Sequence, residues 1–335
     1  MAQAHPTFGR KSSAPWDRLR PVKQDPLESM GFVSKGDNRL LDLKTQESFY
    51  NKIVARYMQF CTQHARDLDG AFASLTLEDA RLPTTVPRNQ AARATEPQPF
   101  QAPGSHQQDN TVPVYGQATA GPTVAPSAEL STILLALRKL REGLLASSAS
   151  AQNPVFSQRV HVFNARAAIL ALHPEGYHPS LLHLLTTLHT PDHPLPRSEL
   201  FEMITYLVLD TAIRQNDLTS AYALRYKYQV RVGFKSRVVD SFLKSIVMGD
   251  WVNFWRVRQK VDGYVRAILH WHLESQRRMA LKAIGRAYYS CDVNWILQSS
   301  TGGEMSWDEL VRAEDVGWMR DGAKVMIRKP KAKAG

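Results

Sequence analysis

The stretch MGDWVNFWRVR (residues 248–258) decides how the C-terminal half of this chain is interpreted, because it places three aromatic rings beside arginines. Trp251, Phe254 and Trp255 recur at helical spacing, which predicts a stripe that faces the protein interior, with the arginines on its flank. The alternative is an exposed platform on which nucleic-acid bases stack, since proteins that bind single strands combine aromatic rings with cations. Aromatic residues at helical spacing are more often core residues, so we favour packing.

A series of helical segments leads up to this stretch. From residue 128 onward, apolar residues recur at steps of three and four, and Pro, Gly, Asn or Asp residues separate the segments. Short connections of this kind are expected where antiparallel helices are neighbours. Helix pairs that stack in sequence form an α-solenoid, so we predict an all-α fold with a helical solenoid over residues 128–263.

The chain after this stretch has a different pattern. RRMALKAIGRAYYS (277–290) and DVNWILQSS (292–300) each predict a helix, and Ser306 followed by Glu309 is a capping box that starts a third. Near the end, Asp321 and Gly322 separate two short apolar segments, which indicates a tight β-hairpin because the turn needs positive φ. Three helices followed by a two-stranded hairpin form a winged helix, which we predict over residues 264–328 as the cap of the solenoid.

The N-terminal part is expected to be ordered only in places. Phe49, Ile53, Tyr57 and Phe60 form one apolar stripe, which predicts an amphipathic helix that packs either on the main domain or on a partner. Its neighbours are polar or rich in Pro, Gln and Ala, with too few apolar side chains to offset the entropy of ordering. The predicted parts are a disordered tail (1–40), the amphipathic helix (41–70), a disordered linker (82–127) and, after the winged helix, a basic tail (329–335).

A helical solenoid that continues into a C-terminal winged helix resembles the PCI family, the scaffold subunits of the proteasome lid, the signalosome and translation initiation factor three. The resemblance covers about residues 129–330 and rests on GDWVNFWRVR (249–258) followed by RRMALKAIGRAYYS (277–290). The same pattern is similar to the Sac-three/GANP relatives that act in mRNA export. The resemblance implies that winged helices of neighbouring subunits pair edge to edge. It also implies packing roles for Trp251, Phe254, Trp255, Leu281, Ile284 and Tyr288.

Composition and motifs argue against several classes of protein. The sequence has no long apolar run that would span a membrane and no apolar segment typical of a secretory signal, and its two cysteines, Cys61 and Cys291, are consistent with a reducing compartment. We therefore expect the nucleus or the cytoplasm. The chain lacks the phosphate-binding, zinc-protease and nucleophile-elbow motifs, so we predict no catalysis and no cofactor. The histidines at 173, 178, 183, 189 and 193 have neither the spacing nor the carboxylate or Cys partners of a metal site, and surface or capping roles are favoured.

The positive charge lies mainly in the part expected to fold. The net charge is +11, and residues from 127 onward hold 28 Lys and Arg against 19 Asp and Glu. Such an excess favours acidic partners, either nucleic acid or protein. Steps of four put Arg278, Lys282 and Arg286 on one helix face, and the C-terminal end adds Arg328, Lys329, Lys331 and Lys333. These residues are candidates for contacts with phosphates, and a solvated helix face with a disordered basic tail is the simpler interpretation. The tail alone is equally consistent with a nuclear-import signal.

These observations predict a non-enzymatic scaffold subunit of a multiprotein complex, whose partners include PCI-type subunits. The predicted assembly edge is the last strand, at Val325 and Ile327, because an unpaired strand edge accepts another strand. An RNA-binding component of an mRNA processing or export complex is the alternative function, with weak RNA or DNA binding by the basic residues. An enzyme of unrecognised type is a distant third.

Overall fold

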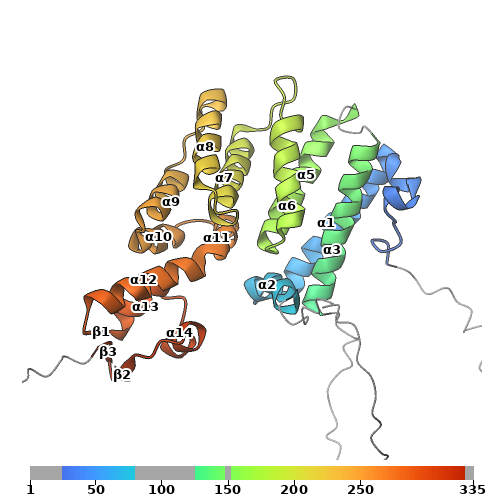
Figure 1. The fold of residues 1–335 in the computed structure, drawn as a ribbon. Helices are drawn as coiled ribbons and strands as arrows, with labels where there is room; N and C mark the ends of the chain where they lie inside the picture. The colour runs from blue at the N-terminus through green and yellow to red at the C-terminus, as the bar shows by residue number, and fades with distance from the viewer. Residues whose placement is uncertain (1–24, 80–124, 148–151, 329–335) are drawn as a thin grey trace, which may run out of the picture.

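The computed structural model describes residues 25–79, 125–147 and 152–328 (Figure 1). Two predictions concern residues outside these ranges: the disorder of residues 1–24 and 82–124, and the role of the cations at Lys329, Lys331 and Lys333. Helices dominate the described part, as the all-α prediction expected. The helices are α1 (Leu43–Gln63), α2 (Leu68–Asp79), α3 (Pro126–Ala146), α5 (Pro154–Leu170), α6 (Pro174–His183), α7 (Arg197–Ile213), α8 (Leu218–Val232), α9 (Arg237–Met248), α10 (Trp251–Arg258), α11 (Gly263–Leu269), α12 (Leu273–Ala287), α13 (Val293–Thr301) and α14 (Trp307–Glu314).

The helix starts follow from local sequence. Side-chain oxygens of Asp42, Asp217, Ser236 and Asp250 each accept a hydrogen bond from a backbone N–H of the first turn, so that donors without a helical partner are satisfied. Between α9 and α10 the chain turns at Gly249, whose φ of 64° is in the left-handed region that favours glycine. The quoted stretch therefore begins with a helix end and a new cap, which fixes where α10 starts.

Residues 25–40, predicted as part of a disordered tail, are instead packed against the helices. Leu27 and Leu40 are buried, and Leu40 belongs to the second of two 3₁₀ turns, Val33–Lys35 and Asn38–Leu41. Leu40 lies so close to Gly143 of α3 that a Cβ at that glycine would be 2.7 Å from the Leu40 carbonyl oxygen. The prediction was wrong because single apolar residues on short turns leave no 3.6-residue period in the sequence.

The amphipathic helix predicted for residues 41–70 packs on the same chain. It comprises α1 and the start of α2, and Phe49, Ile53 and Phe60 of its stripe are buried. The ring of Tyr50 meets Phe156 edge to face at 5.8 Å, which joins α1 to α5. The stripe is thus covered within the described chain, so a partner is not needed to bury it.

The helices follow one another across the molecule, and the chain then returns. In Figure 1, α1 to α3, α5 with α6, α7 with α8, and α9 with α10 succeed each other from one side of the body to the other. α11 packs against α5 and α7, and its residues Val265, Ile268 and Leu269 belong to the core of this body. The predicted domain boundary at residue 264 is therefore too early, because α11 is part of the body. The C-terminal module begins with α12.

The C-terminal module has its own small core and a sheet. Its strands are β1 (Ser290–Asp292), β2 (Met319–Asp321) and β3 (Lys324–Met326), in the order β1-β3-β2 with antiparallel pairs. The predicted hairpin is confirmed as β2–β3, although its turn is Gly322–Ala323 and Asp321 pairs with Lys324. Gly322 has φ of 56°, as in a type II′ turn. Strand β1 was not predicted. The module core consists of Leu281, Ile284, Val293, Ile296, Trp307, Leu310 and Val325.

Candidate interaction surfaces of the C-terminal module

The aromatic residues of the quoted stretch are core residues. Phe254 and Trp255 are buried and Trp251 is half-buried against the core, so the packing interpretation is confirmed. Phe254 meets Phe242 of α9 edge to face at 5.5 Å. Arg258 was expected on the exposed flank, but it is buried and forms an ion pair with Glu304. The stretch therefore offers no stacking platform.

The second set of predicted packing residues is only partly correct. Leu281 and Ile284 are buried in the core of the module, as expected, but 45% of Tyr288 is exposed. α12 ends at Ala287, and Tyr288 follows it with extended backbone (φ −119°, ψ 150°). The helical period no longer applies at that position, so the Tyr288 side chain points away from the stripe to which it was assigned.

Exposed aromatic rings gather instead where α12 meets β1 and α13. Tyr288, Tyr289 and Trp295 are 45%, 59% and 43% exposed, and the rings of Tyr288 and Trp295 meet edge to face at 5.3 Å. The Arg328 guanidinium lies over the Tyr289 ring at 5.2 Å, and its Nη2 donates to the Arg286 carbonyl (2.6 Å). We call Arg286, Tyr288, Tyr289, Trp295 and Arg328 the aromatic–cation surface. The consecutive tyrosines after a helix were the sequence signal for it, but they were read as part of the helix.

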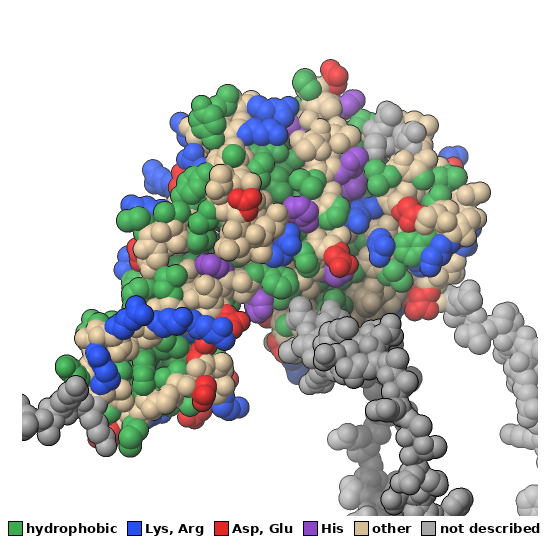
Figure 2. Space-filling view, in the orientation of Figure 1, with side chains coloured by type: hydrophobic (Ala, Val, Ile, Leu, Met, Phe, Trp, Pro, Cys, Tyr) green, Lys and Arg blue, Asp and Glu red, His purple; other side chains and the backbone are tan. Residues whose placement is uncertain are grey.

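The basic face of α12 is exposed but not uniformly free. Figure 2 shows a row of Lys and Arg side chains over the helices of this module, and Arg278, Lys282 and Arg286 are all exposed. Arg278 is bound by two carboxylates, Glu274 at 2.5 Å and Glu314 at 2.9 Å. The hydrogen bond that Arg278 donates to Glu314 raises the pKa of Arg278, and the charge of Glu274 adds to the effect. Within the described chain, Lys282 and Arg286 form no ion pair, so the free charge lies toward the end of α12.

The predicted assembly edge at Val325 and Ile327 is wrong. β3 is the central strand, paired on both sides, and Val325 is fully buried. Ile327 donates its N–H to the Tyr289 carbonyl (2.8 Å), so it is also paired. The error arose because β1 was not predicted, and β1 covers the side of β3 that was expected to be free. The edges of the sheet are β1 and β2, and every residue of β2 is exposed.

Three of the five histidines considered as metal ligands have separate partners. Nδ1 of His178 lies 3.1 Å from Asp210, and the His183 ring packs on His161 at 4.8 Å between centroids. Nδ1 of His189 accepts from the backbone N–H of Leu195 at 3.1 Å, while His193 is exposed. The described residues contain no group of three or more His, Cys, Asp or Glu side chains placed to hold a metal ion.

The buried polar network at Asp210 serves the fold. Its carboxylate is fully buried and accepts from Tyr177 Oη (2.6 Å), Arg214 Nε (2.7 Å) and Gln215 Nε2 (2.9 Å), besides its contact with His178. Burial alone would raise the pKa of Asp210, but hydrogen bonds from His178, Arg214 and Tyr177 outweigh burial and hold the pKa well below its usual range. Each of its oxygens is occupied by donors of the same chain, which is the pattern of a structural carboxylate.

Within the described ranges, no helix combines the length and the apolar character needed to cross a membrane. Comparison with known proteins adds no identification, since no family model and no curated protein matches this chain.

Proposed function

We propose that this protein is a non-catalytic scaffold subunit of a multiprotein complex, of the PCI type, in which a helical solenoid is capped by a winged helix. The successive helix layers that lead into a small module of three helices and a hairpin support this architecture. The open edge at β2 is the observation that carries the proposal, because it offers backbone groups to a strand of another subunit.

The geometry of the hairpin shows which backbone groups the edge presents. In a hairpin with a two-residue turn, the pair that flanks the turn, Asp321 and Lys324, exchanges hydrogen bonds. The next pair, Arg320 and Val325, is therefore a non-hydrogen-bonded pair. The N–H and C=O of Arg320 point away from β3, toward the open edge, whereas those of Val325 point toward β1.

Replacement of Arg320 by proline tests the edge without breaking the sheet. Arg320→Pro removes an outward-facing N–H, and proline is tolerated in edge strands when that N–H faces solvent. Arg320→Ala is the matched control, because it removes the same side chain, including its Nε hydrogen bond to the Gly322 carbonyl, but keeps the N–H. We expect affinity purification of the full-length Arg320→Pro variant, followed by mass spectrometry, to lose the subunits that the Ala variant retains. Equal recovery of the same subunits by both variants would rule out pairing at this edge.

RNA binding is the second candidate function, and the aromatic–cation surface favours it. Rings that are 43–59% exposed lie near Arg286 and Arg328, and Lys282 lies one turn before Arg286 on α12. This matches the combination of stacking and phosphate contacts that single-strand binders use. We propose weak binding without sequence preference, secondary to contacts with protein subunits. Because Arg278 is held by two carboxylates, it is expected to contribute less than the other cations.

The salt dependence of binding to a single-stranded oligouridylate separates these roles. Each phosphate contact contributes about −0.7 to the slope of log affinity against log salt. Replacement of Lys282, Arg286 and Arg328 by Ala should remove about 2 from the slope, while Arg278→Ala changes it little. Tyr289→Ala should lower affinity by about 1–3 kcal/mol, the value of one stacked base, at unchanged slope. If the oligonucleotide binds the triple variant with the slope of the wild type, this surface does not hold RNA.

A further inference from the structure

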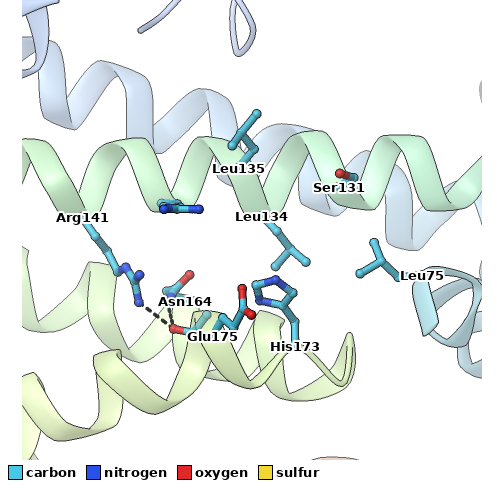
Figure 3. Close-up of a pocket in the computed structure, with 10 residues that line it drawn as sticks. Leu75, Ser131, Leu134, Leu135, Arg141, Asn164, His173 and Glu175 are labelled. Atoms are coloured by element: carbon cyan, nitrogen blue, oxygen red, sulfur yellow. Dashed lines mark hydrogen bonds between the residues drawn. The ribbon is translucent and has the colours of Figure 1, made fainter. Parts of the chain in front are cut away.

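A cavity lined by both polar and apolar side chains lies in the helical body, far from the surfaces of the C-terminal module. It has a volume of about 330 Å³ and lies between α3, α5 and α6, with α2 at one end. Figure 3 shows Arg141 and Asn164 at one end of this space and Leu75 at the other, with Leu134 and His173 between them. Arg138 also lines it. Cavities of this size hold small ligands in many proteins.

Arg141 is unusual in this cavity because, among the residues that the structure describes, its charge has no acidic partner. Its Nη1 donates to the Gly176 carbonyl (2.7 Å) and to Ser180 Oγ (2.9 Å), and neither acceptor is charged. Burial lowers the pKa of Arg141, and the positive charge of Arg138 acts in the same direction. Arg141 is half-buried, and a cation that is partly removed from water without a counter-charge is costly, because cations in protein interiors are normally paired.

The hydrogen bonds of Arg141 are also not needed to satisfy its acceptors. Nδ2 of Asn164 donates to the same two atoms, at 2.8 Å to the Gly176 carbonyl and at 2.6 Å to Ser180 Oγ. A neutral side chain of similar length at position 141 would leave both acceptors paired. These contacts therefore do not explain why a positive charge stands at position 141.

The surroundings of Arg141 make the cavity electropositive. Arg138 lies one turn earlier on α3, and its guanidinium lies over the Phe32 ring at 5.6 Å. Among the described residues, no carboxylate forms an ion pair with Arg138. The first turn of α6 lies at the wall, at Glu175 and Gly176, and the start of a helix carries partial positive charge. Among the described residues that line the cavity, Glu175 carries the carboxylate, and this carboxylate forms no ion pair with Arg138 or Arg141.

We propose that this cavity binds a small oxyanion, a carboxylate or a phosphate carried on a compact apolar group, with Arg141 and Arg138 as its counter-charges. The apolar group would lie toward Leu134 and Leu75, and the anionic head toward the arginines. The oxyanion can belong to a free small molecule or to the carboxyl terminus of a peptide. This binding site goes beyond the proposed scaffold function and does not depend on it.

Thermal unfolding of the full-length protein with defined anions tests the site. The probes are sodium phosphate, sodium hexanoate and a short apolar peptide with a free C-terminal carboxylate, each compared with sodium chloride at matched ionic strength. A ligand at about ten times its Kd should raise the unfolding midpoint of a body of this size by about 3–6 °C. We expect at least one probe to raise the midpoint of the wild type saturably. A response to phosphate or hexanoate indicates a free anion, and a response to the peptide alone indicates a peptide terminus.

Variants connect the response to the arginines. Arg141→Met should fold, because Asn164 keeps both acceptors paired, and should lose the response. Arg141→Lys keeps the charge and should retain part of the response, and Arg138→Met should weaken it, so the test does not depend on one variant. Arg256→Met, at an exposed arginine far along the chain, is the control and should respond as the wild type does. The proposal is overturned if no probe shifts the wild type, or if Arg141→Met responds as strongly as the wild type.

Discussion

The helical body and the C-terminal module differ in how much of their surface they bury. The body, which comprises residues 25–42 and the helices from α1 to α11, has one continuous core that extends from Leu27 to Leu269. The module, from α12 to β3, has a core of seven buried hydrophobic residues and leaves Tyr289, Trp295 and Met319 largely exposed. So small a core provides little stability of its own, because small units bury a smaller fraction of their surface. The comparison indicates that the body supplies the stability and the module supplies exposed surface.

The junction between the two parts depends on the quoted stretch. Trp255 belongs to the core of the body, yet a Cβ added at Gly302 of the module would lie 3.0 Å from its ring. Gln259 Nε2 donates to the Gly302 carbonyl (2.8 Å), and Arg258 pairs with Glu304. The last turn of α10 and its C-cap residue thus contribute three side chains that attach the module to the body.

Removal of the Trp255 side chain should have the largest effect and should separate the two parts. Trp255→Ala leaves a cavity at a buried site, and such changes cost about 3–5 kcal/mol of unfolding free energy. Because the same ring contacts the module, we expect urea unfolding followed by circular dichroism to show two transitions in place of one. A single transition with an unchanged midpoint would show that the ring is not essential to either part.

Loss of the Asp210 charge should destabilise the body without affecting the module. Asp210→Asn keeps the shape of the side chain but leaves Arg214 without its counter-charge, at a cost of about 3 kcal/mol. The folded-state pKa of Asp210 is depressed, so the stabilisation from its charge is complete above the unfolded pKa near 3.8 and is lost as pH falls below that value. Urea titrations from pH 7 to pH 3 should show a loss of stability in the wild type below pH 4 that is smaller in the variant. Asp308→Asn, at an exposed residue of α14, is the control.

The same comparison shows where the sequence was informative. The stripe of Phe49, Ile53 and Phe60 and the Asp321–Gly322 signal predicted a helix and a hairpin correctly, because period and turn chemistry are local properties. Strand β1 has only three residues, and it is a strand because β3 pairs with it from more than thirty residues along the chain. A pairing of that kind has no local signature.

The candidate surfaces were predicted less well than the fold, for a related physical reason. The free charge of the α12 face is at Lys282 rather than Arg278, because Glu314 of α14 folds back onto Arg278. Exposure of Tyr288 depends on the end of α12, and helix ends are the least predictable part of a helix. The position of a charged or aromatic residue on a helix could be read from the sequence, but its partner from another element could not.

Replacement of His161 should change the pH dependence of the body by a smaller amount. Burial, followed by the charges of His183 and Arg141, lowers the pKa of His161 to about 3. The unfolded chain therefore binds a proton below about pH 6.5 that the folded chain does not, and stability falls as pH decreases from 6.5 toward 3. The slope from this residue is at most about 1.4 kcal/mol per pH unit. His161→Gln should flatten the dependence between pH 6.5 and 4.5 in urea titrations, whereas His193→Gln, at an exposed position, should not.

Replacement of Trp295 should have the smallest effect on stability, and it allows a direct comparison of the module with the body. Trp255 and Trp295 are the same residue type on the two sides of the junction, but one is buried and the other is 43% exposed. The contacts of the Trp295 ring include Tyr288, at 5.3 Å, and edge-to-face pairs of this kind contribute about 0.5–1.5 kcal/mol. Trp295→Ala should therefore lower the unfolding free energy by about 1 kcal/mol or less in the same urea titration. If Trp295→Ala destabilises the protein as much as Trp255→Ala does, the ring is a structural element of the module, and the aromatic–cation surface is not a free binding surface.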